Sequence, residues 1–370
     1  MTYTDTIRGG AKSIKVLDCL RDQIIQGLLA PGAKLPKRTE LASLFQVSGI
    51  TIQRVLNDLV ADGFVTARRR QGTFVTDRPP HVYDYALVAT AARLKRPDSL
   101  YIEAFERAAA EIQKNTPFRV SVFRYGDLNE KDTTFQRLAR KIRHKALAGI
   151  VFPFNPYELV NTPVLDEPGL PRIAMMAGPC GELPRIEIDM DGWMDQAGQH
   201  LVKLGRRRVA VLAVGGEPEE VDSKADRLRK QGLIVPPVLV QMVSPAYPKW
   251  ATLTAQLLMR GGPDERPDAM VIMDDNLVEH ATMGLRASGV NIPGDLTVVA
   301  HANLPYTPKA MVPVTFLGFP IDTLLRRCMA HIDAQRAGQS PPSVSTLAAE
   351  FSSKPAVRVA AGAHPLSSGG

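Results

Sequence analysis

Residues 31–75 read PGAKLPKRTELASLFQVSGITIQRVLNDLVADGFVTARRRQGTFV, and this segment contains the most specific pattern in the chain. It begins with one apolar helical face, and a second follows the turn at Val47-Ser48-Gly49. Two short helices joined by such a tight turn predict a helix-turn-helix unit, whose second helix can lie in a DNA major groove. The apolar positions are Leu41, Leu44 and Phe45 on the first helix, and Ile52, Val55, Leu56 and Leu59 on the second.

A β-hairpin is expected directly after the second helix. Gly63 can end that helix, because a residue without Cβ tolerates the left-handed turn at a helix end. Residues 64–67 and 73–75 then have the composition of two strands, with a turn at Arg69-Arg70-Gln71-Gly72 between them. The tip carries positive charge, as a loop that follows DNA phosphates requires. The sequence therefore predicts a winged helix-turn-helix.

The distribution of charge supports a DNA-binding role for this segment. The chain has 370 residues and a formal net charge of +7. Residues 1–80 hold twelve Lys or Arg and seven Asp or Glu, so most of the positive excess lies there. Such a concentration is typical of a module that binds nucleic acid.

Cysteine usage and hydropathy bear on the compartment. Cys19, Cys180 and Cys328 are far apart and form neither a disulfide framework nor a zinc motif, which favours a reducing environment. The N-terminus lacks the apolar core of a signal peptide, and no run reaches membrane-spanning length. We therefore expect a cytoplasmic protein with no membrane partner.

The same stretch resembles the GntR family of bacterial winged-helix transcription regulators. The resemblance implies that the protein binds double-stranded operator DNA. The matching residues are Gly27, Pro31-Gly32, Leu35-Pro36, Glu40-Leu41-Ala42, Phe45, Val47-Ser48, Thr51, Leu56, Leu59, Gly63 and Gly72-Thr73-Phe74-Val75.

The arginines that this family uses for DNA contacts are partly replaced here. Lys37-Arg38-Thr39 stands for the usual Ser-Glu-Arg, and Gly49 and Gln53 stand where arginines are common. Arg favours guanine edges, whereas Gln pairs with adenine, so we expect Gln53 and Arg54 to reach bases. The alternative for Gln53 is an ordinary solvated helix residue. The predicted DNA-binding residues are Lys37, Arg38, Thr39, Ser48, Gly49, Thr51, Gln53, Arg54, Arg68, Arg69, Arg70, Gln71 and Gly72.

Domain boundaries follow from composition. Residues 1–76 form the predicted DNA-binding domain, and 77–83 are a proline-stiffened linker. Over 84–357, about ten short apolar strands alternate with amphipathic helices, which indicates parallel sheets covered on both faces and an α/β class. Residues 358–370 are expected to be a disordered tail.

The second domain is similar to the effector domain of LacI/GalR-type repressors. The resemblance implies a two-lobed, periplasmic-binding-protein-like fold with a ligand cleft between the lobes. It also implies a small-molecule effector, such as a sugar or sugar derivative, and a homodimer. A GntR-type DNA-binding domain joined to such a domain is the arabinose-repressor-like arrangement. The matching segments are 147–153, 200–212, 267–276, 289–299 and 312–315.

Effector contacts are expected in the loops after the strands, where open α/β sheets bind ligands. The family's arginine on the helix after strand 209–213 is missing, and His301-Ala302-Asn303 stands where an aspartate is favoured. His301 is expected to be a packed core histidine. The predicted effector-binding residues are Arg93, Phe154, Asn155, Asp189, Asp191, Asp274, Asp275, Asn303 and Tyr306.

Together these features predict a ligand-responsive transcription regulator, a repressor acting as a homodimer. Asp274 and Asp275 are adjacent at a strand end and point in opposite directions, so they do not form an acid/base pair. No catalytic residue, metal site or cofactor is predicted. Two alternatives remain: a regulator whose α/β domain only dimerises and binds no small molecule, and a solute-binding protein for transport, which the winged helix disfavours.

Overall fold

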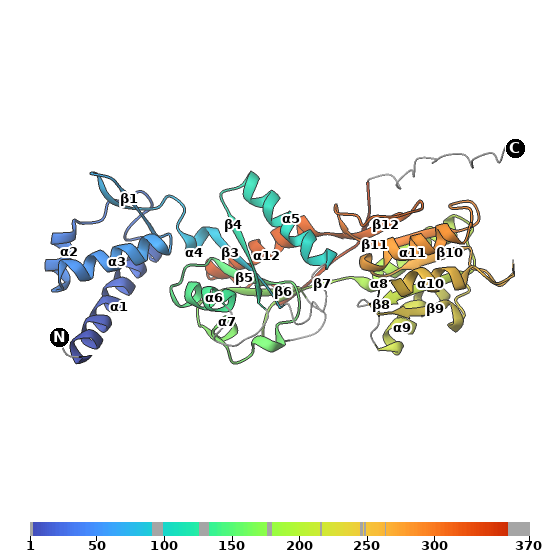
Figure 1. The fold of residues 1–370 in the computed structure, drawn as a ribbon, viewed down its shortest axis with the longest axis horizontal. Coiled ribbons are helices and arrows are strands. Elements are labelled where there is room, and N and C mark those ends of the chain that lie inside the picture. The colour runs from blue at the N-terminus through green and yellow to red at the C-terminus, as the bar shows by residue number, and fades with distance from the viewer. Residues whose placement is uncertain are drawn as a thin grey trace, which may run out of the picture. The chain divides into compact units, whose positions relative to one another are not determined.

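The computed structural model describes residues 3–90, 99–125, 133–175, 180–214, 217–244, 247, 249–262 and 264–353. The predicted effector residue Arg93 and the expected tail at 358–370 lie outside these ranges. The chain divides into two compact units (Figure 1). The first comprises Met1–Arg93, Ala109–Arg185 and Arg326–Ser343, and the second comprises Leu94–Ala108, Ile186–Leu325 and Val344–Gly370. Among the described residues, no helix has both the length and the apolar character needed to span a membrane.

The first unit begins with a winged helix-turn-helix, as predicted. Its elements are α1 (Tyr3–Ile25), α2 (Arg38–Phe45), α3 (Gly49–Ala61), β1 (Val65–Arg68) and β2 (Gly72–Val75). The four apolar positions predicted for α3 are buried. The prediction for Leu44 was wrong: its side chain is 70% exposed, because Leu41 and Phe45, one turn apart, form the inward face of the short α2.

Local hydrogen bonding explains where these elements begin and end. Ser48 is the N-cap of α3, and its hydroxyl accepts from the backbone N–H of Thr51 at 3.2 Å. Gly63 follows α3 with φ +83°, a left-handed conformation that suits a residue without Cβ. Strands β1 and β2 are antiparallel, with Arg68 opposite Gly72, so Arg69–Gln71 form the wing tip.

The rest of the first unit is the first lobe. It contains α4 (Pro80–Tyr83), β3 (Asp84–Thr90), β4 (Arg119–Tyr125), α6 (Thr133–Arg143), β5 (Gly149–Phe152), η1 (Tyr157–Leu159), α7 (Pro163–Asp166) and β6 (Arg172–Met175). Strand β3 is parallel to β4 and β5, and β5 is parallel to β6. Helices α5 (Leu100–Asn115) and α12 (Ile321–Arg336) each contribute residues to both units.

The second lobe occupies the second unit. Its elements are α8 (Met190–Lys203), β8 (Val209–Val214), α9 (Pro218–Arg229), η2 (Pro237–Leu239), β9 (Val240–Val243), α10 (Lys249–Leu258), β10 (Ala269–Ile272), α11 (Asp275–Ala287), β11 (Thr297–Leu304), β12 (Thr315–Pro320) and β14 (Glu350–Phe351).

Two six-stranded sheets organise the lobes. The orders are β13-β7-β6-β5-β3-β4 and β14-β12-β11-β10-β8-β9, where β7 is Arg185–Ile188 and β13 is Val344–Leu347. In the second sheet, strands β8, β9, β10, β11 and β12 are parallel to one another. Strand β14 pairs antiparallel with β12. The predicted α/β class with parallel sheets is confirmed. Strands β12, β13 and β14 were not predicted.

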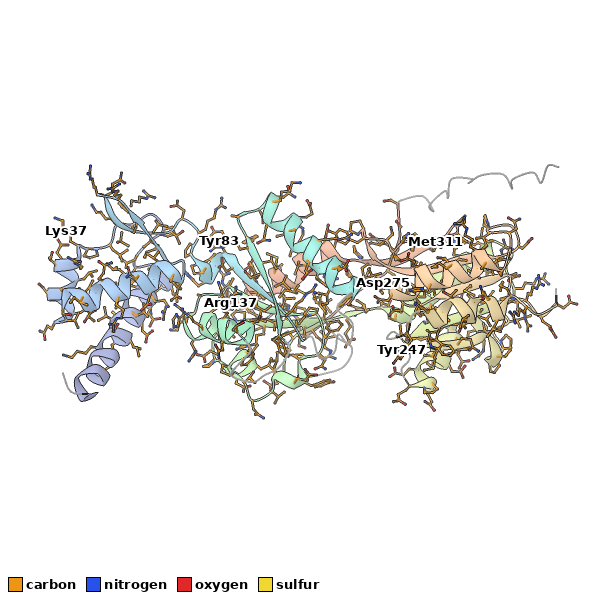
Figure 2. All side chains as sticks on the ribbon, in the orientation of Figure 1. Lys37, Tyr83, Arg137, Tyr247, Asp275 and Met311 are labelled. Carbon is orange, nitrogen blue, oxygen red and sulfur yellow. The ribbon has the colours of Figure 1, made fainter. Side chains whose placement is uncertain are left out.

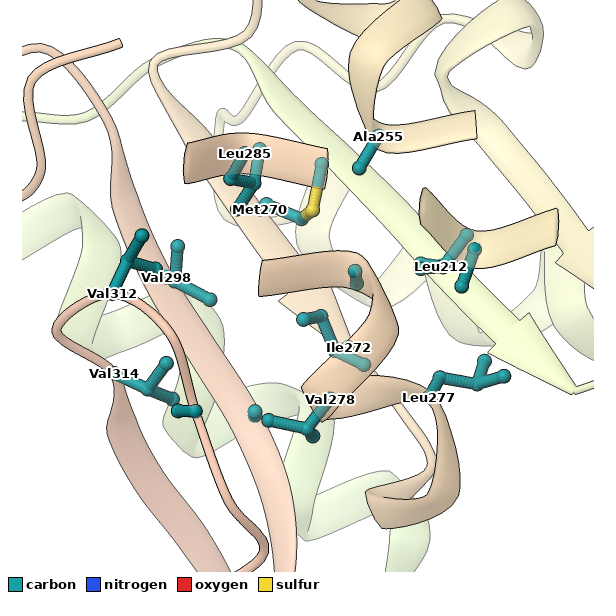
Figure 3. Close-up of a cluster of buried hydrophobic side chains, with 14 of the residues drawn as sticks. Leu212, Ala255, Met270, Ile272, Leu277, Val278, Leu285, Val298, Val312 and Val314 are labelled. Carbon is teal, nitrogen blue, oxygen red and sulfur yellow. The ribbon is translucent and has the colours of Figure 1, made fainter. Parts of the chain in front are cut away.

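A buried apolar cluster fixes the strand ends of the second lobe (Figure 3). Leu212, Met270 and Ile272 from β8 and β10 lie in one cluster with Leu277 and Leu285 of α11, all without exposed surface. Burying each such side chain stabilises the fold by roughly 1.5–3 kcal/mol. The loop after β10 and the end of β11 are therefore held on a rigid base.

Candidate nucleic-acid interface and effector residues

A groove of about 800 Å³ lies between α3 and the wing. Its ionisable lining residues are all basic, so it carries the positive charge that duplex phosphates attract. Figure 2 labels Lys37, which immediately precedes α2 at one side of the groove. The lining residues are Lys34, Leu35, Pro36, Lys37, Arg38, Gln53, Leu56, Asn57, Val60, Ala67, Arg68, Arg70, Gln71, Gly72 and Thr73.

The structure brings seven of the predicted DNA-binding residues together in this groove. The hydroxyl of Ser48 already caps α3. Thr39, Arg54 and Arg69 are exposed, but they are not part of the groove lining. The seven are Lys37, Arg38, Gln53, Arg68, Arg70, Gln71 and Gly72, and the predicted residues outside the lining are Thr39, Ser48, Gly49, Thr51, Arg54 and Arg69.

Eight of the fifteen lining residues were not predicted from the sequence, and Lys34 and Asn57 are among them. Asn57 follows Gln53 by four residues and so lies on the same face of α3, a spacing that could have identified it. Lys34 forms a β-bridge with Phe74 of the wing, a pairing for which the sequence offers no signal.

The wing holds its cations in place through Phe74. The Lys34 ammonium lies 5.8 Å and the Arg68 guanidinium 4.7 Å from the centre of the Phe74 ring. Both distances suit cation–π attraction. Gly72 has φ +116°, and a Cβ there would come within 2.9 Å of Lys34 Cε. The positive φ is what favours glycine at this position, because the flexible end of Lys34 could move away from a Cβ.

An acidic residue at the end of α3 joins the winged helix to the first lobe. Asp62 is the C-cap of α3, and its side chain is 6% exposed. Its carboxylate lies 2.7 Å from His144 Nδ1, 3.5 Å from an Arg140 nitrogen and 3.4 Å from an Arg21 nitrogen. Arg21 belongs to α1, whereas Arg140 and His144 belong to α6 and the residue after it. We call these four residues the Asp62 cluster.

Further contacts extend this junction. Lys145 Nζ donates to Asp22 at 2.7 Å, and Ala146 packs into the apolar core of the winged helix. His81, in the predicted linker, stacks on Phe64 with ring centres 5.8 Å apart. Burial, with a smaller contribution from Arg336, lowers the pKa of His81 to about 4, so the ring is neutral at pH 7. Residues 79–83 of this segment are therefore packed and include α4, whereas Asp77 and Arg78 are exposed.

In the first lobe, Phe154 and Asn155 follow β5, as predicted. Asn155 is 8% exposed, and neither atom of its amide has a hydrogen-bond partner among the described residues. A buried amide without partners costs roughly 1–3 kcal/mol. Such a group is typical of a position where a ligand supplies the missing hydrogen bonds.

In the second lobe, Asp274, Asp275 and Asn303 lie at the ends of β10 and β11 (Asp275 is labelled in Figure 2). Asn303 donates to Asp275 at 2.5 Å, and both side chains are buried. Burial, together with the nearby Asp274, raises the pKa of Asp275 to about 7. Asp274 caps α11 by accepting from the backbone N–H of Asn276 at 2.9 Å. The three polar side chains thus have fixed orientations.

His301 lies on β11, two residues before Asn303, and has aromatic neighbours. The ring centres of Trp193 and Phe319 lie 6.2 Å and 5.8 Å from that of His301. Its Nδ1 is buried and has no partner in the described part of the chain. Burial lowers the pKa of His301 to about 4, so the imidazole is neutral at pH 7.

Like Asp274, Asp275 and Asn303, three further predicted effector residues have partners inside the chain. Asp189 accepts from the backbone N–H of Gly192 at 2.8 Å. Asp191 pairs with Lys224 and Arg227 of α9, and the hydrogen bond from Lys224 holds the pKa of Asp191 below its usual range. The Tyr306 hydroxyl lies 3.2 Å from Asp322.

Comparison with known proteins agrees with both halves of this description. Residues 12–75 match the bacterial regulatory proteins of the gntR family, and residues 199–351 match the periplasmic binding protein-like domain. The arabinose metabolism transcriptional repressor of Geobacillus stearothermophilus is 23% identical over 326 residues, which cover 80% of this chain and 83% of the relative.

Solved structures of transcription regulators share the fold. A LacI-family regulatory protein from Chloroflexus aggregans superimposes with a TM-score of 0.57 at 17% identity, covering 72% of this chain and 96% of that one. The transcriptional regulator CelR in complex with cellobiose gives a TM-score of 0.54 at 19% identity, covering 87% and 100%.

These findings define the class of protein as a transcription regulator with a gntR-type DNA-binding domain. In particular, the chain joins a GntR-type helix-turn-helix domain to a periplasmic-binding-protein-like domain.

The raised pKa of Asp275 leads to a prediction about stability. Between pH 4 and pH 7 the folded protein holds this proton and the unfolded chain, with a pKa near 3.8, does not. The contribution of Asp275 to stability therefore falls as pH rises, by up to about 1.4 kcal/mol per pH unit, and is constant above pH 7.

Urea unfolding of the wild type and of the Asp275→Asn variant, measured from pH 4.5 to 8, tests this directly. The free energy of unfolding of the wild type should decrease relative to that of the variant up to about pH 7. Parallel curves over the whole range would show that the carboxyl is not protonated in the folded state.

Proposed function

We propose that this protein is a repressor that binds operator DNA through the groove between α3 and the wing, and that a sugar-like effector changes its operator affinity. The amide of Asn155, which has no hydrogen-bond partner among the described residues, supports the effector site most directly, because it lies after a strand of the first lobe. A sugar hydroxyl both donates and accepts, and an amide can meet both needs. The relative named for arabinose metabolism and the cellobiose complex of CelR support a sugar.

The polar residues of the second lobe suit the same kind of ligand. Asp274 offers a carboxylate on the edge of a rigid helix, and the Asp275–Asn303 pair lies beside it. We infer that the protein acts in the cytoplasm, where its DNA target is, and that it catalyses no reaction.

The Asp62 cluster supplies a route by which the effector domain can influence DNA binding. Arg140 and His144 of the first lobe contact the carboxylate that ends the DNA-reading helix α3. A displacement of α6 would therefore move α3. A coupling of about 1–3 kcal/mol between effector and operator is sufficient for regulation.

The effector proposal predicts that sugars stabilise the protein and change its DNA affinity. Pentoses, hexoses, uronic acids and polyols are screened by thermal shift, and hits are tested by fluorescence anisotropy with operator-containing duplex at fixed salt. Asn155→Ala should weaken binding of the sugar roughly tenfold or more by removing two hydrogen bonds. The matched control is Asn115→Ala, at the exposed end of α5.

If no compound in the panel shifts the melting temperature, the result favours the alternative that the α/β domain serves only for dimerisation. A sugar that stabilises the protein but leaves operator affinity unchanged would contradict its role as an effector.

We also propose a homodimer, with α10 contributing to its interface. Trp250, Leu253 and Leu257 are 60%, 50% and 61% exposed and lie on one face of α10 by their spacing. Exposed apolar side chains grouped in this way are typical of protein–protein contacts. A dimer would present two copies of α3 to half-sites about 34 Å apart.

Leu257→Glu should convert the dimer to a monomer in sedimentation-velocity experiments, because it places a charge in the apolar interface. Val202→Glu is the matched control, since Val202 is 46% exposed on α8. The proposal fails if the wild type is monomeric at micromolar concentration or if both variants behave alike.

A further inference from the structure

Three side chains of the groove form a hydrogen-bonded row along its DNA-facing surface. Arg38 of α2 donates to Gln53 Oε1 at 3.3 Å, and Gln53 Nε2 donates to Asn57 Oδ1 at 3.0 Å. All three side chains are exposed and line the groove. Gln53 and Asn57 are one helical turn apart on α3, so the row runs along the helix axis.

The position of Arg38 compensates for a missing side chain on α3. A Cβ at Gly49 would lie 3.9 Å from Arg38 Nε, so the guanidinium occupies the space beside this glycine. A side chain from α2 thus supplies the cation at the start of α3. It also orients the amide of Gln53, because the guanidinium is always charged and can only donate.

We propose that Gln53 and Asn57 read adenine bases in the major groove and that Arg38 is the residue that positions Gln53. The proposal rests on the function of this groove as the DNA interface. It names the bases that the interface selects, which the fold alone does not specify.

The hydrogen-bonding groups that Gln53 still has free match those of adenine. A primary amide has two acceptor lone pairs and two N–H donors. Arg38 uses one lone pair and Asn57 receives one N–H, so one acceptor and one donor remain. Adenine needs this pair, since its N6 amino group donates and its N7 accepts. Guanine presents two acceptors there, N7 and O6, and the free lone pair of Gln53 would face one of them.

Asn57 has the same capacity. Its Oδ1 accepts from Gln53, which leaves one lone pair and both N–H groups available for a second adenine. Arg54, although adjacent to Gln53, is not part of the groove lining and is not assigned to base reading.

The test is selection of full-length protein against a randomised duplex library, followed by competition binding at fixed salt. The wild type should enrich adenine at positions in each half-site. Gln53→Ala should reduce the preference for adenine over guanine at one position by roughly tenfold or more. Asn57→Ala should reduce the same preference at a neighbouring position. Gln53→Arg should change the preferred base at its position to guanine.

Two more variants separate base reading from general affinity. Arg38→Ala should lower the adenine preference at the position assigned to Gln53, because the amide is no longer oriented. Arg69→Ala, at the wing tip, should weaken binding to all sequences alike and leave the base preference intact.

The outcomes distinguish this inference from the proposed function. Tight binding whose base preference is the same in the wild type, Gln53→Ala and Asn57→Ala would overturn the inference and leave the DNA-binding function standing. Failure of the wild type to retain any duplex would overturn the function itself.

Discussion

The buried carboxylate of Asp62 is the interaction on which the arrangement of the first unit depends. It lies at the C-terminal end of α3, where the helix dipole disfavours negative charge. It is also almost wholly removed from water, so it needs cationic or hydrogen-bonding partners. Those partners come from α1 on one side and from α6 and His144 on the other. The side chains of Arg140 and His144 are 51% and 27% exposed, so solvent screens part of their attraction to the carboxylate.

This requirement gives the junction a mechanical role. The Asp62 cluster joins the winged helix to the first lobe together with the Lys145–Asp22 ion pair. Through this cluster the recognition helix ends on side chains from the first lobe, and Ala146 contributes to the winged-helix core. The first lobe, which carries Asn155 after β5, is therefore in direct contact with the helix that lines the groove.

The sequence predicted those features that arise from local spacing. The face formed by Ile52, Val55 and Leu59 and the cap at Ser48 involve residues within a few turns of one another, and the structure has both. Leu44 was assigned wrongly because a three-residue spacing does not show which edge of a short helix faces the core. Strand β12 was missed because it follows Pro313 closely and contains Gly318, two residue types that are uncommon in strands.

Contacts between distant parts of the chain could not be predicted. Asp62 and His144 are 82 positions apart, and the ordinary surface charge of α6 gave no sign of a buried partner. Asp191 follows a strand, as expected of an effector-binding residue, but its carboxylate forms ion pairs with Lys224 and Arg227. The row from Arg38 to Asn57 likewise depends on how α2 packs against α3, which periodicity does not specify.

Backbone nitrogen-15 relaxation of the full-length protein measures whether the winged helix and the first lobe tumble as one body. If the Asp62 cluster joins the winged helix to the first lobe, amides of residues 12–75 and of strands β3 to β6 share one rotational correlation time. A clearly shorter correlation time for residues 12–75 would show that the DNA-binding domain tumbles independently, and would contradict the coupling described above.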